Sequence, residues 1–178
     1  MKDTLRVLVG WDCNLYCSYC CNLIPEIRKN IIPTRLQDVE WDKYQTFCIS
    51  GGEPLMDMKM VRNICKHIPE GRLIVLYTNG TLLTRPIAKS LVNLKVRALN
   101  VGLHRDAFNG MRYLISGFAE LIESTLDSTQ DLPLNVRFCV QNIYEEAWNL
   151  SKCFPYTKFR FWKMNDCTRD NEDRIILI

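Results

Sequence analysis

The chain has no apolar run of membrane-spanning length among its 178 residues. No segment approaches the roughly 20 consecutive apolar residues that a transmembrane helix needs. The first ten residues, MKDTLRVLVG, contain too short an apolar stretch for a secretory signal peptide. These absences predict an intracellular, cytoplasmic protein without a membrane partner.

The chain also lacks any excess of one charge. Its 23 lysines and arginines against 20 aspartates and glutamates give a net charge of +3, and the two signs are interspersed, so no nucleic-acid surface is indicated. No Ser/Gly-rich linker or low-complexity segment divides the sequence. We therefore expect a single domain over residues 1–178, with a core at 4–164 and a C-terminal tail at 165–178.

Cysteine, in contrast, is plentiful, and four of the nine cysteines fall within the segment WDCNLYCSYCCN at 11–22. Disulfides rarely persist in a reducing cytoplasm, so clustered thiols there more often bind metal or take part in chemistry. Cys48, Cys65 and Cys139 lie singly in apolar segments, where we expect them to fill the core.

Hydrophobic periodicity predicts strands that alternate with helices. Six short β-branched or aromatic runs, ended by Gly, Asn, Asp or Pro, indicate strands at 4–10, 44–50, 72–78, 96–103, 133–140 and 158–164. Helical patterns occupy 60–68, 87–92 behind a Thr84 cap, and 111–122, with a short helix near 36–41. The alternation predicts an α/β fold with a mostly parallel sheet, either open or an incomplete barrel.

Functional loops of such folds leave the carboxyl ends of the strands. In strand order these ends read GWDC, SGGEP, TNGT, GLHRD, VQN and MND. The cysteine cluster and a pair of glycines are therefore expected on one rim of the sheet.

The spacing C-x3-C-x2-C at Cys13, Cys17 and Cys20 suits a [4Fe–4S] cluster. Three thiolates can hold three irons and leave the fourth open to a small bidentate ligand. Zinc is the alternative, but it prefers four ligands that usually come as separated pairs. Cys21 adds little to either reading, because adjacent cysteines seldom reach one ion without strain. Spacing alone leaves zinc open.

Motifs at three strand ends point further: C-x3-C-x-aromatic-C with Tyr19 in the aromatic place, G-G-E-P at 51–54, and T-N-G at 78–80. With these motifs the sequence resembles the radical S-adenosylmethionine (radical SAM) superfamily, from Leu5 to about Met164. The resemblance implies a partial (β/α)6 TIM-like barrel with outer helices, a [4Fe–4S] cluster on Cys13, Cys17 and Cys20, and S-adenosylmethionine on the open iron.

The resemblance also implies the reaction and the binding residues. An external flavodoxin- or ferredoxin-like reductant supplies an electron, and the 5′-deoxyadenosyl radical formed from S-adenosylmethionine abstracts hydrogen from a substrate. The glycines at 51 and 52 let backbone approach the ligand, so a side chain at 52 is expected to weaken S-adenosylmethionine binding while the cluster still assembles. The residues expected at this cofactor are Tyr19, Gly51, Gly52, Glu53, Pro54, Thr78, Asn79, Gly102, Asn142, Trp162 and Lys163.

The fourth strand end departs from the pattern of peptide-modifying relatives, which commonly read V-S-L-D-G. Here residues 101–105 read VGLHR, so His104 stands where the relatives carry aspartate. A histidine can titrate near neutral pH and is the candidate catalytic residue, with a structural hydrogen bond as the alternative.

Substrate identity is not written in these motifs. The chain is short and lacks a cysteine-rich extension, which suggests a small stand-alone barrel acting on a small molecule or nucleotide. The alternatives are an activase that generates a glycyl radical on a partner enzyme, since Asn22 forms C-x-N with Cys20, or a peptide-modifying enzyme. From another class, a non-enzymatic iron–sulfur or zinc redox sensor stays open.

Something must cover the mouth of an incomplete barrel, because a radical exposed to solvent is quenched. The candidates are the segment 22–43, a second protein or second copy of this chain, and the apolar tail at 175–178. We expect the tail to dock on the barrel or at a homodimer contact.

Overall fold

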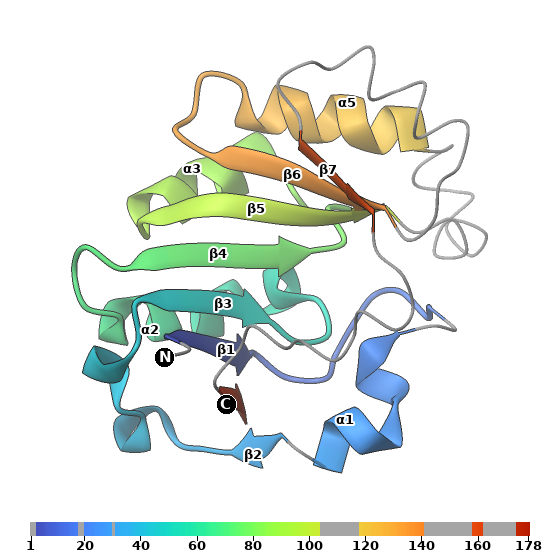
Figure 1. Ribbon diagram of the computed structural model, residues 1–178. Coiled ribbons are helices and arrows are strands. Elements are labelled where there is room, and N and C mark those ends of the chain that lie inside the picture. Colours follow the sequence, from blue (N-terminus) through green and yellow to red (C-terminus); the bar gives the residue numbers. More distant parts are fainter. Residues whose placement is uncertain (1–2, 18–19, 30, 104–117, 141–157, 162–173) are drawn as a thin grey trace.

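The structure, a computed structural model, describes residues 3–17, 20–29, 31–103, 118–140, 158–161 and 174–178. One sheet of eight strands runs through this part in the order β2-β8-β1-β3-β4-β5-β6-β7, and all neighbours are parallel (Figure 1). The strands are β1 (Thr4–Leu8), β2 (Ile32–Pro33), β3 (Thr46–Ser50), β4 (Leu73–Thr78), β5 (Val96–Leu103), β6 (Asn135–Val140), β7 (Lys158–Phe161) and β8 (Arg174–Leu177).

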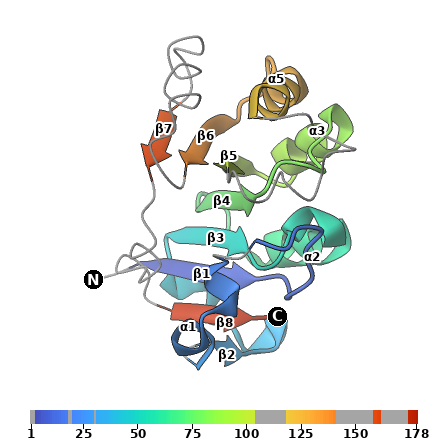
Figure 2. The same cartoon turned by 90° about the vertical axis from the view of Figure 1, so that its right-hand side faces the viewer.

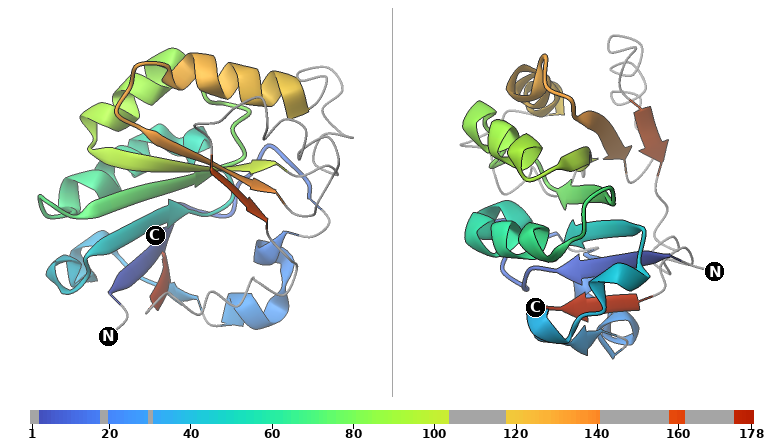
Figure 3. Two further views of the ribbon diagram at one scale, coloured as in Figure 1. Left: turned by 45° about the horizontal axis from the view of Figure 1, so that its top comes forward. Right: turned by 90° about the vertical axis from the view of Figure 1, so that its left-hand side faces the viewer.

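The two faces of the sheet differ because successive strand residues point to opposite sides. One face carries the main core, including the fully buried Phe47, Ile49 and Leu76. Helices α2 (Met58–His67), α3 (Arg85–Asn93) and α5 (Phe118–Thr129) lie on this side (Figures 2 and 3). The opposite face, called the inner face below, carries a smaller apolar cluster of Cys48, Val75 and Ala98 packed with Tyr77.

The six strands expected from the sequence are all present, and the fold class is confirmed as a mostly parallel α/β sheet that stays open like a partial barrel. Cys48 and Cys65 are buried as expected. Cys139, which lies on the inner face, is only half-buried. Two short 3₁₀ helices, Leu36–Asp38 and Trp41–Lys43, occupy the place of the expected short helix.

The helices begin where polar and proline residues allow. The side chain of Asp57 accepts a hydrogen bond from the Met60 N–H and caps α2. Thr84 occupies the predicted N-cap position of α3, but its side chain makes no capping hydrogen bond. Pro86 instead favours the first turn through its fixed φ. The third helical pattern lies partly outside the described residues and continues as α5.

No helix in the described ranges is long and apolar enough to cross a membrane.

The C-terminal segment is part of the sheet and not an appendage to a core ending at residue 164. Strand β8 lies between β2 and β1, with Leu5 paired to Arg174 and Leu8 to Leu177. The Thr34 N–H donates to the Leu177 carbonyl at 2.9 Å, so the region after the cysteines joins the same edge. The expectation that the apolar tail docks on the barrel is therefore confirmed. The tail docks as a strand of the sheet, which its four apolar residues alone did not predict.

Replacing Ile176 with alanine should destabilise the fold by about 2 to 5 kcal/mol, because this side chain is 1% exposed and leaves a cavity in the main core. Urea unfolding followed by circular dichroism measures the difference. Ile32→Ala is the matched control, since Ile32 is paired in register with Ile176 but is 44% exposed, and it should cost less than about 0.5 kcal/mol. Equal losses in the two variants would contradict this position of β8.

Candidate functional site

Three loops meet at the carboxyl ends of β1, β3 and β4, which are neighbours in the sheet (Figure 1). They are the cysteine loop (residues 9–23), the GGEP loop (51–57) and the TNG loop (78–84). Parallel neighbours place their following loops on one rim, so the common location follows from the strand order. The hydrogen bonds among the three loops are specific, as described next.

The GGEP loop lies directly against the backbone of the cysteine loop. The Gly52 N–H donates to the Gly10 carbonyl at 2.9 Å, and the Glu53 N–H donates to the Asp12 carbonyl at 2.7 Å. A Cβ on Gly52 would stand 1.9 Å from the Asp12 carbonyl oxygen, and one on Gly51 would stand 2.7 Å from the Gly10 carbonyl oxygen. Both glycines are thus required by contact with the cysteine loop, and a side chain at 52 would displace that loop itself. The expectation that such a side chain leaves cluster assembly intact is not supported by this geometry.

Glu53 joins the GGEP loop to the TNG loop. Its carboxylate accepts hydrogen bonds from the Thr78 hydroxyl at 2.7 Å, the Asn79 N–H at 2.7 Å and the Leu55 N–H at 3.1 Å. The side chain is 4% exposed. Burial raises the pKa of Glu53 above its ordinary value, and the three hydrogen bonds oppose that shift. Glu53 therefore acts as a structural link between loops.

The Asn79 side chain connects the TNG loop to the cysteine loop. Its amide Nδ2 donates to the Asn14 Oδ1 at 2.8 Å and lies 3.9 Å from the Cys13 Sγ. Its Oδ1 accepts from the hydroxyl and the N–H of Thr81, while Asn14 donates to the same hydroxyl. Asn14 and Thr81 were not identified from the sequence, although Asn14 lies within the cysteine motif and Thr81 directly follows T-N-G.

The three candidate cluster thiols, Cys13, Cys17 and Cys20, are all half-buried. Burial raises the pKa of the Cys13 thiol, a hydrogen bond from the Leu15 N–H lowers it, and the nearby Glu53 and Cys20 raise it. Within the described residues, no three His, Cys, Asp or Glu side chains are gathered around a single point that could hold one metal ion. A [4Fe–4S] cluster does not require such a point, because each thiolate binds a different iron.

The far end of the cysteine loop is held by two further contacts. The Asn22 amide donates to the Gly51 carbonyl at 2.6 Å. The guanidinium of Arg28, in α1 (Pro25–Lys29), lies over the Trp11 ring at 4.7 Å from its centre. Both contacts tie the segment after the cysteines to the rim.

The other predicted site residues are placed as follows. Pro54 is buried at the start of a 3₁₀ helix, and Gly102 is half-buried near the end of β5. Tyr19, His104, Asn142, Trp162 and Lys163 lie outside the described residues, so their roles stay predictions.

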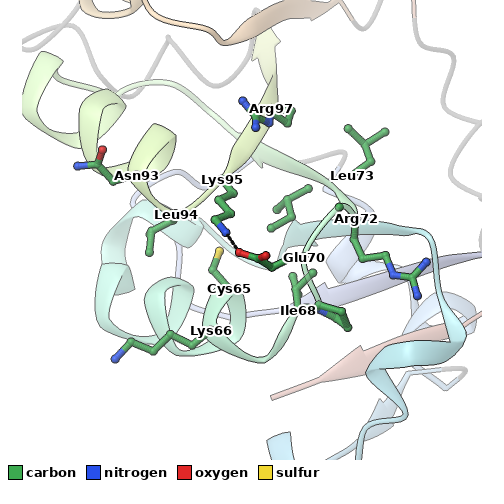
Figure 4. Close-up of a pocket in the computed structure, with 13 residues that line it drawn as sticks. Cys65, Lys66, Ile68, Glu70, Arg72, Leu73, Asn93, Leu94, Lys95 and Arg97 are labelled. Carbon is green, nitrogen blue, oxygen red and sulfur yellow. Dashed lines mark hydrogen bonds and ion pairs between the residues drawn. The ribbon is translucent and has the colours of Figure 1, made fainter.

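A hollow of about 530 Å³ lies at the opposite end of the strands from the three loops (Figure 4). It is bounded by the end of α2, the start of β4 and the start of β5. Its wall carries the ion pair between Lys95 and Glu70, and also Arg72 and Arg97. Its position separates it from the motif residues, and we do not include it in the site.

The family model described as Radical SAM superfamily matches residues 8–107, more than half of the chain. The chain belongs to the radical SAM superfamily. The matched region contains the cysteine loop, the GGEP loop and the TNG loop.

The following known proteins are similar to this radical SAM chain, and each of them is longer. An uncharacterized protein of Methanocaldococcus jannaschii is 28% identical over 141 residues, which cover 77% of this chain and 46% of that protein. A protein of Methanococcus aeolicus named "Probable GTP 3′,8-cyclase" is 29% identical over 153 residues, which cover 78% of this chain and 50% of that protein. Coproporphyrinogen III oxidase (HemN) from Escherichia coli, a radical SAM enzyme, shares the fold with a TM-score of 0.58 at 11% identity, over 91% of this chain and 44% of its own. The chain spans about half the length of these relatives.

Radical SAM proteins use a [4Fe–4S] cluster and S-adenosylmethionine. The possible ligands in this chain fit the cluster, since three half-buried thiols lie on one loop at the carboxyl ends of the strands. The neighbouring GGEP and TNG loops are already fixed against that loop by hydrogen bonds. The arrangement therefore has the parts that the family's cofactors require.

Gly52→Ala should lower the iron content of the reconstituted radical SAM protein severalfold, because the new methyl group collides with the Asp12 backbone beside Cys13. Iron is measured per polypeptide after anaerobic reconstitution. Gly71→Ala is the control: Gly71 has a φ of +80° with open space around its Cβ, so the change costs about 1 kcal/mol of backbone strain without a clash and should leave the iron content unchanged. Normal iron in Gly52→Ala would show that the loop adapts.

Glu53→Gln should destabilise the fold by about 1 to 3 kcal/mol, because an amide NH₂ replaces one of two oxygens that accept buried hydrogen bonds. Urea unfolding measures this difference. Glu70→Gln removes an exposed carboxylate that pairs with Lys95 at the other end of the sheet, and its effect should be far smaller. A Glu53→Gln protein as stable as the wild type would contradict the linking role.

Proposed function

We propose that this chain is a radical SAM enzyme that acts on a small molecule or nucleotide. The supporting observation is the network that joins the three motif loops, in which Gly52, Glu53 and Asn79 all bond directly across loop boundaries. A cofactor that touches all three loops needs them in one fixed arrangement before it binds.

The residues of the cysteine loop hold the cluster in this proposal. Cys13, Cys17 and Cys20 each bind one iron, while Cys21 does not, because its neighbour Cys20 already does. When bound, the cluster and S-adenosylmethionine supply a 5′-deoxyadenosyl radical that abstracts hydrogen from a substrate.

In this proposal the protein's own polar residues hold the three loops in position around the cofactors. Asn79 and Asn14 fix the loop that carries Cys13, and Glu53 acts through the loops it joins, since both of its oxygens accept hydrogen bonds from the protein. The predicted cofactor contacts at Gly51, Gly52 and Thr78 remain part of the proposal, as does His104 in hydrogen transfer.

The substrate class is supported by similarity and by one contact. The Methanococcus aeolicus protein is named for an action on a nucleotide. Asn22, whose position suggested a glycyl-radical activase, donates its amide to the Gly51 carbonyl, so a loop-fixing role accounts for it. A small molecule or nucleotide is therefore favoured over a protein or peptide substrate.

The partners and location belong to the proposal as well. A flavodoxin- or ferredoxin-like protein supplies the electron. The protein works in the reducing cytoplasm, where its cysteines stay reduced and can bind the [4Fe–4S] cluster. A homodimer that covers the barrel mouth stays a prediction.

The test is anaerobic reconstitution followed by incubation with S-adenosylmethionine and dithionite. The wild type should form 5′-deoxyadenosine, and Cys13→Ala, Cys17→Ala and Cys20→Ala should each lose the iron, the visible cluster absorbance and this product. Cys21→Ala is the matched control and should keep all three. A protein that binds iron but never forms 5′-deoxyadenosine would instead support the redox-sensor alternative, and cluster loss in Cys21→Ala alone would overturn the ligand assignment.

A further inference from the structure

The inner face of the sheet carries a row of polar side chains that the motif loops do not use. Asn100 of β5 is the register partner of Tyr77 on β4 and of Arg137 on β6. Ser50 of β3 follows Ile49, the partner of Leu76, and so lies beside Tyr77. We call Ser50, Tyr77, Asn100 and Arg137 the polar row. It crosses four neighbouring strands in the centre of the sheet.

Several atoms of the polar row have unmet hydrogen-bonding capacity. Asn100 is 5% exposed and Ser50 is 7% exposed. The Ser50 Oγ, the Asn100 Oδ1 and the Arg137 Nε are all buried without a hydrogen-bond partner among the described residues. Buried polar groups that are left unpaired destabilise the fold. Three of them in one row indicate a surface shaped for a bound polar molecule.

The charged side chains that the described part of this face carries include Arg6 and Arg137. Arg6 of β1 is 5% exposed, and its guanidinium lies over the Tyr77 ring at 4.2 Å from the ring centre. Strands β1, β3, β4, β5 and β6 contain no aspartate or glutamate. Arg137 has no aspartate or glutamate on its own strand or on the described strands β5 and β7 beside it, which favours an anion as its partner.

The phenol of Tyr77 adds a donor to the row. Burial raises the pKa of Tyr77 above its ordinary value, although the Arg6 guanidinium opposes the shift. Tyr77 therefore remains protonated at neutral pH and can donate a hydrogen bond to a ligand oxygen.

We propose that the polar row binds the substrate through an anionic group, a carboxylate or a phosphate, held by Arg137. The unpaired Asn100 Oδ1 accepts from a hydroxyl or amino group of the same molecule, and Ser50 can donate or accept. The substrate is accordingly an anionic small molecule that also carries a hydrogen-bond donor.

The inference rests on the proposed function for its location, because it places the substrate beside the cofactor loops. Ser50 directly precedes Gly51, and Tyr77 directly precedes Thr78, so the polar row begins where the GGEP and TNG loops leave the sheet. The carboxylate of S-adenosylmethionine is a second source of the same chemistry, and the experiment separates the two sources.

The experiment uses the reconstituted protein and two probes, glycerol 3-phosphate and glycerate, with neutral glycerol as the blank. Isothermal titration gives their dissociation constants and, separately, that of S-adenosylmethionine. The variants are Arg137→Gln, Arg137→Lys, which keeps the charge, and the control Arg97→Gln, which removes an exposed arginine from the far end of β5.

The wild type should bind at least one anionic probe and not glycerol, and the stronger probe identifies the preferred anion. Arg137→Gln should weaken that probe at least tenfold, Arg137→Lys should weaken it less, and Arg97→Gln should change it less than twofold. S-adenosylmethionine affinity and iron content should stay within twofold of the wild type in all variants, which also shows that they fold.

Three results would overturn the inference. They are no binding of either probe at tens of millimolar, undiminished binding by Arg137→Gln, and a loss of S-adenosylmethionine affinity in parallel with the probe, which would assign Arg137 to the cofactor. Arginine-dependent probe binding by a protein that never cleaves S-adenosylmethionine would contradict the proposed function and leave the anion site standing.

Discussion

The backbone of Gly52 lies so close to that of Asp12 that the place of a single methyl group is already filled by the Asp12 carbonyl. This approach fixes the distance between the loops after β1 and β3, and the hydrogen bonds of Gly52 and Glu53 fix their alignment. The three cysteines follow on one of these loops, so their position relative to the rim depends on this contact. Glycine at 52 thereby serves the cysteine loop even though it lies 39 positions beyond Cys13.

The buried Glu53 carboxylate extends the same arrangement to a third strand. Three donors satisfy it, and none of them carries a formal charge, so a buried carboxyl group lies close to the candidate cluster thiol of Cys13. Burial is the main reason that ionising Cys13 costs energy and that its pKa is raised, and the proximity of Glu53 adds to this cost. A metal cluster removes that cost, because the irons neutralise the thiolates.

The sequence predicted what periodicity and local motifs can report. The six strands are long enough to show β-branched runs, and the motif at 51–54 lies directly after β3, where the sequence predicted a loop. The role of Gly52 in fixing the cysteine loop was not predictable, because its contact with Asp12 joins segments that lie far apart in the sequence. Strand β2 was missed because it consists of only Ile32 and Pro33, and β8 because an apolar stretch reads equally well as a docking tail. The polar row was missed for a related reason: Asn100 and Arg137 become neighbours only through the register of β5 and β6.

The position of β8 bears on how the molecule assembles. Strand β1 pairs with β8, and the partners Leu5 and Arg174 are separated by almost the whole chain. Contacts of such sequence separation carry a large loop-closure entropy and form late in folding. Until β8 has been made, strand β1, from which the cysteine loop departs, therefore has open backbone groups on one side. The support of the cysteine loop is therefore completed only when β8, from a distant part of the sequence, pairs with β1.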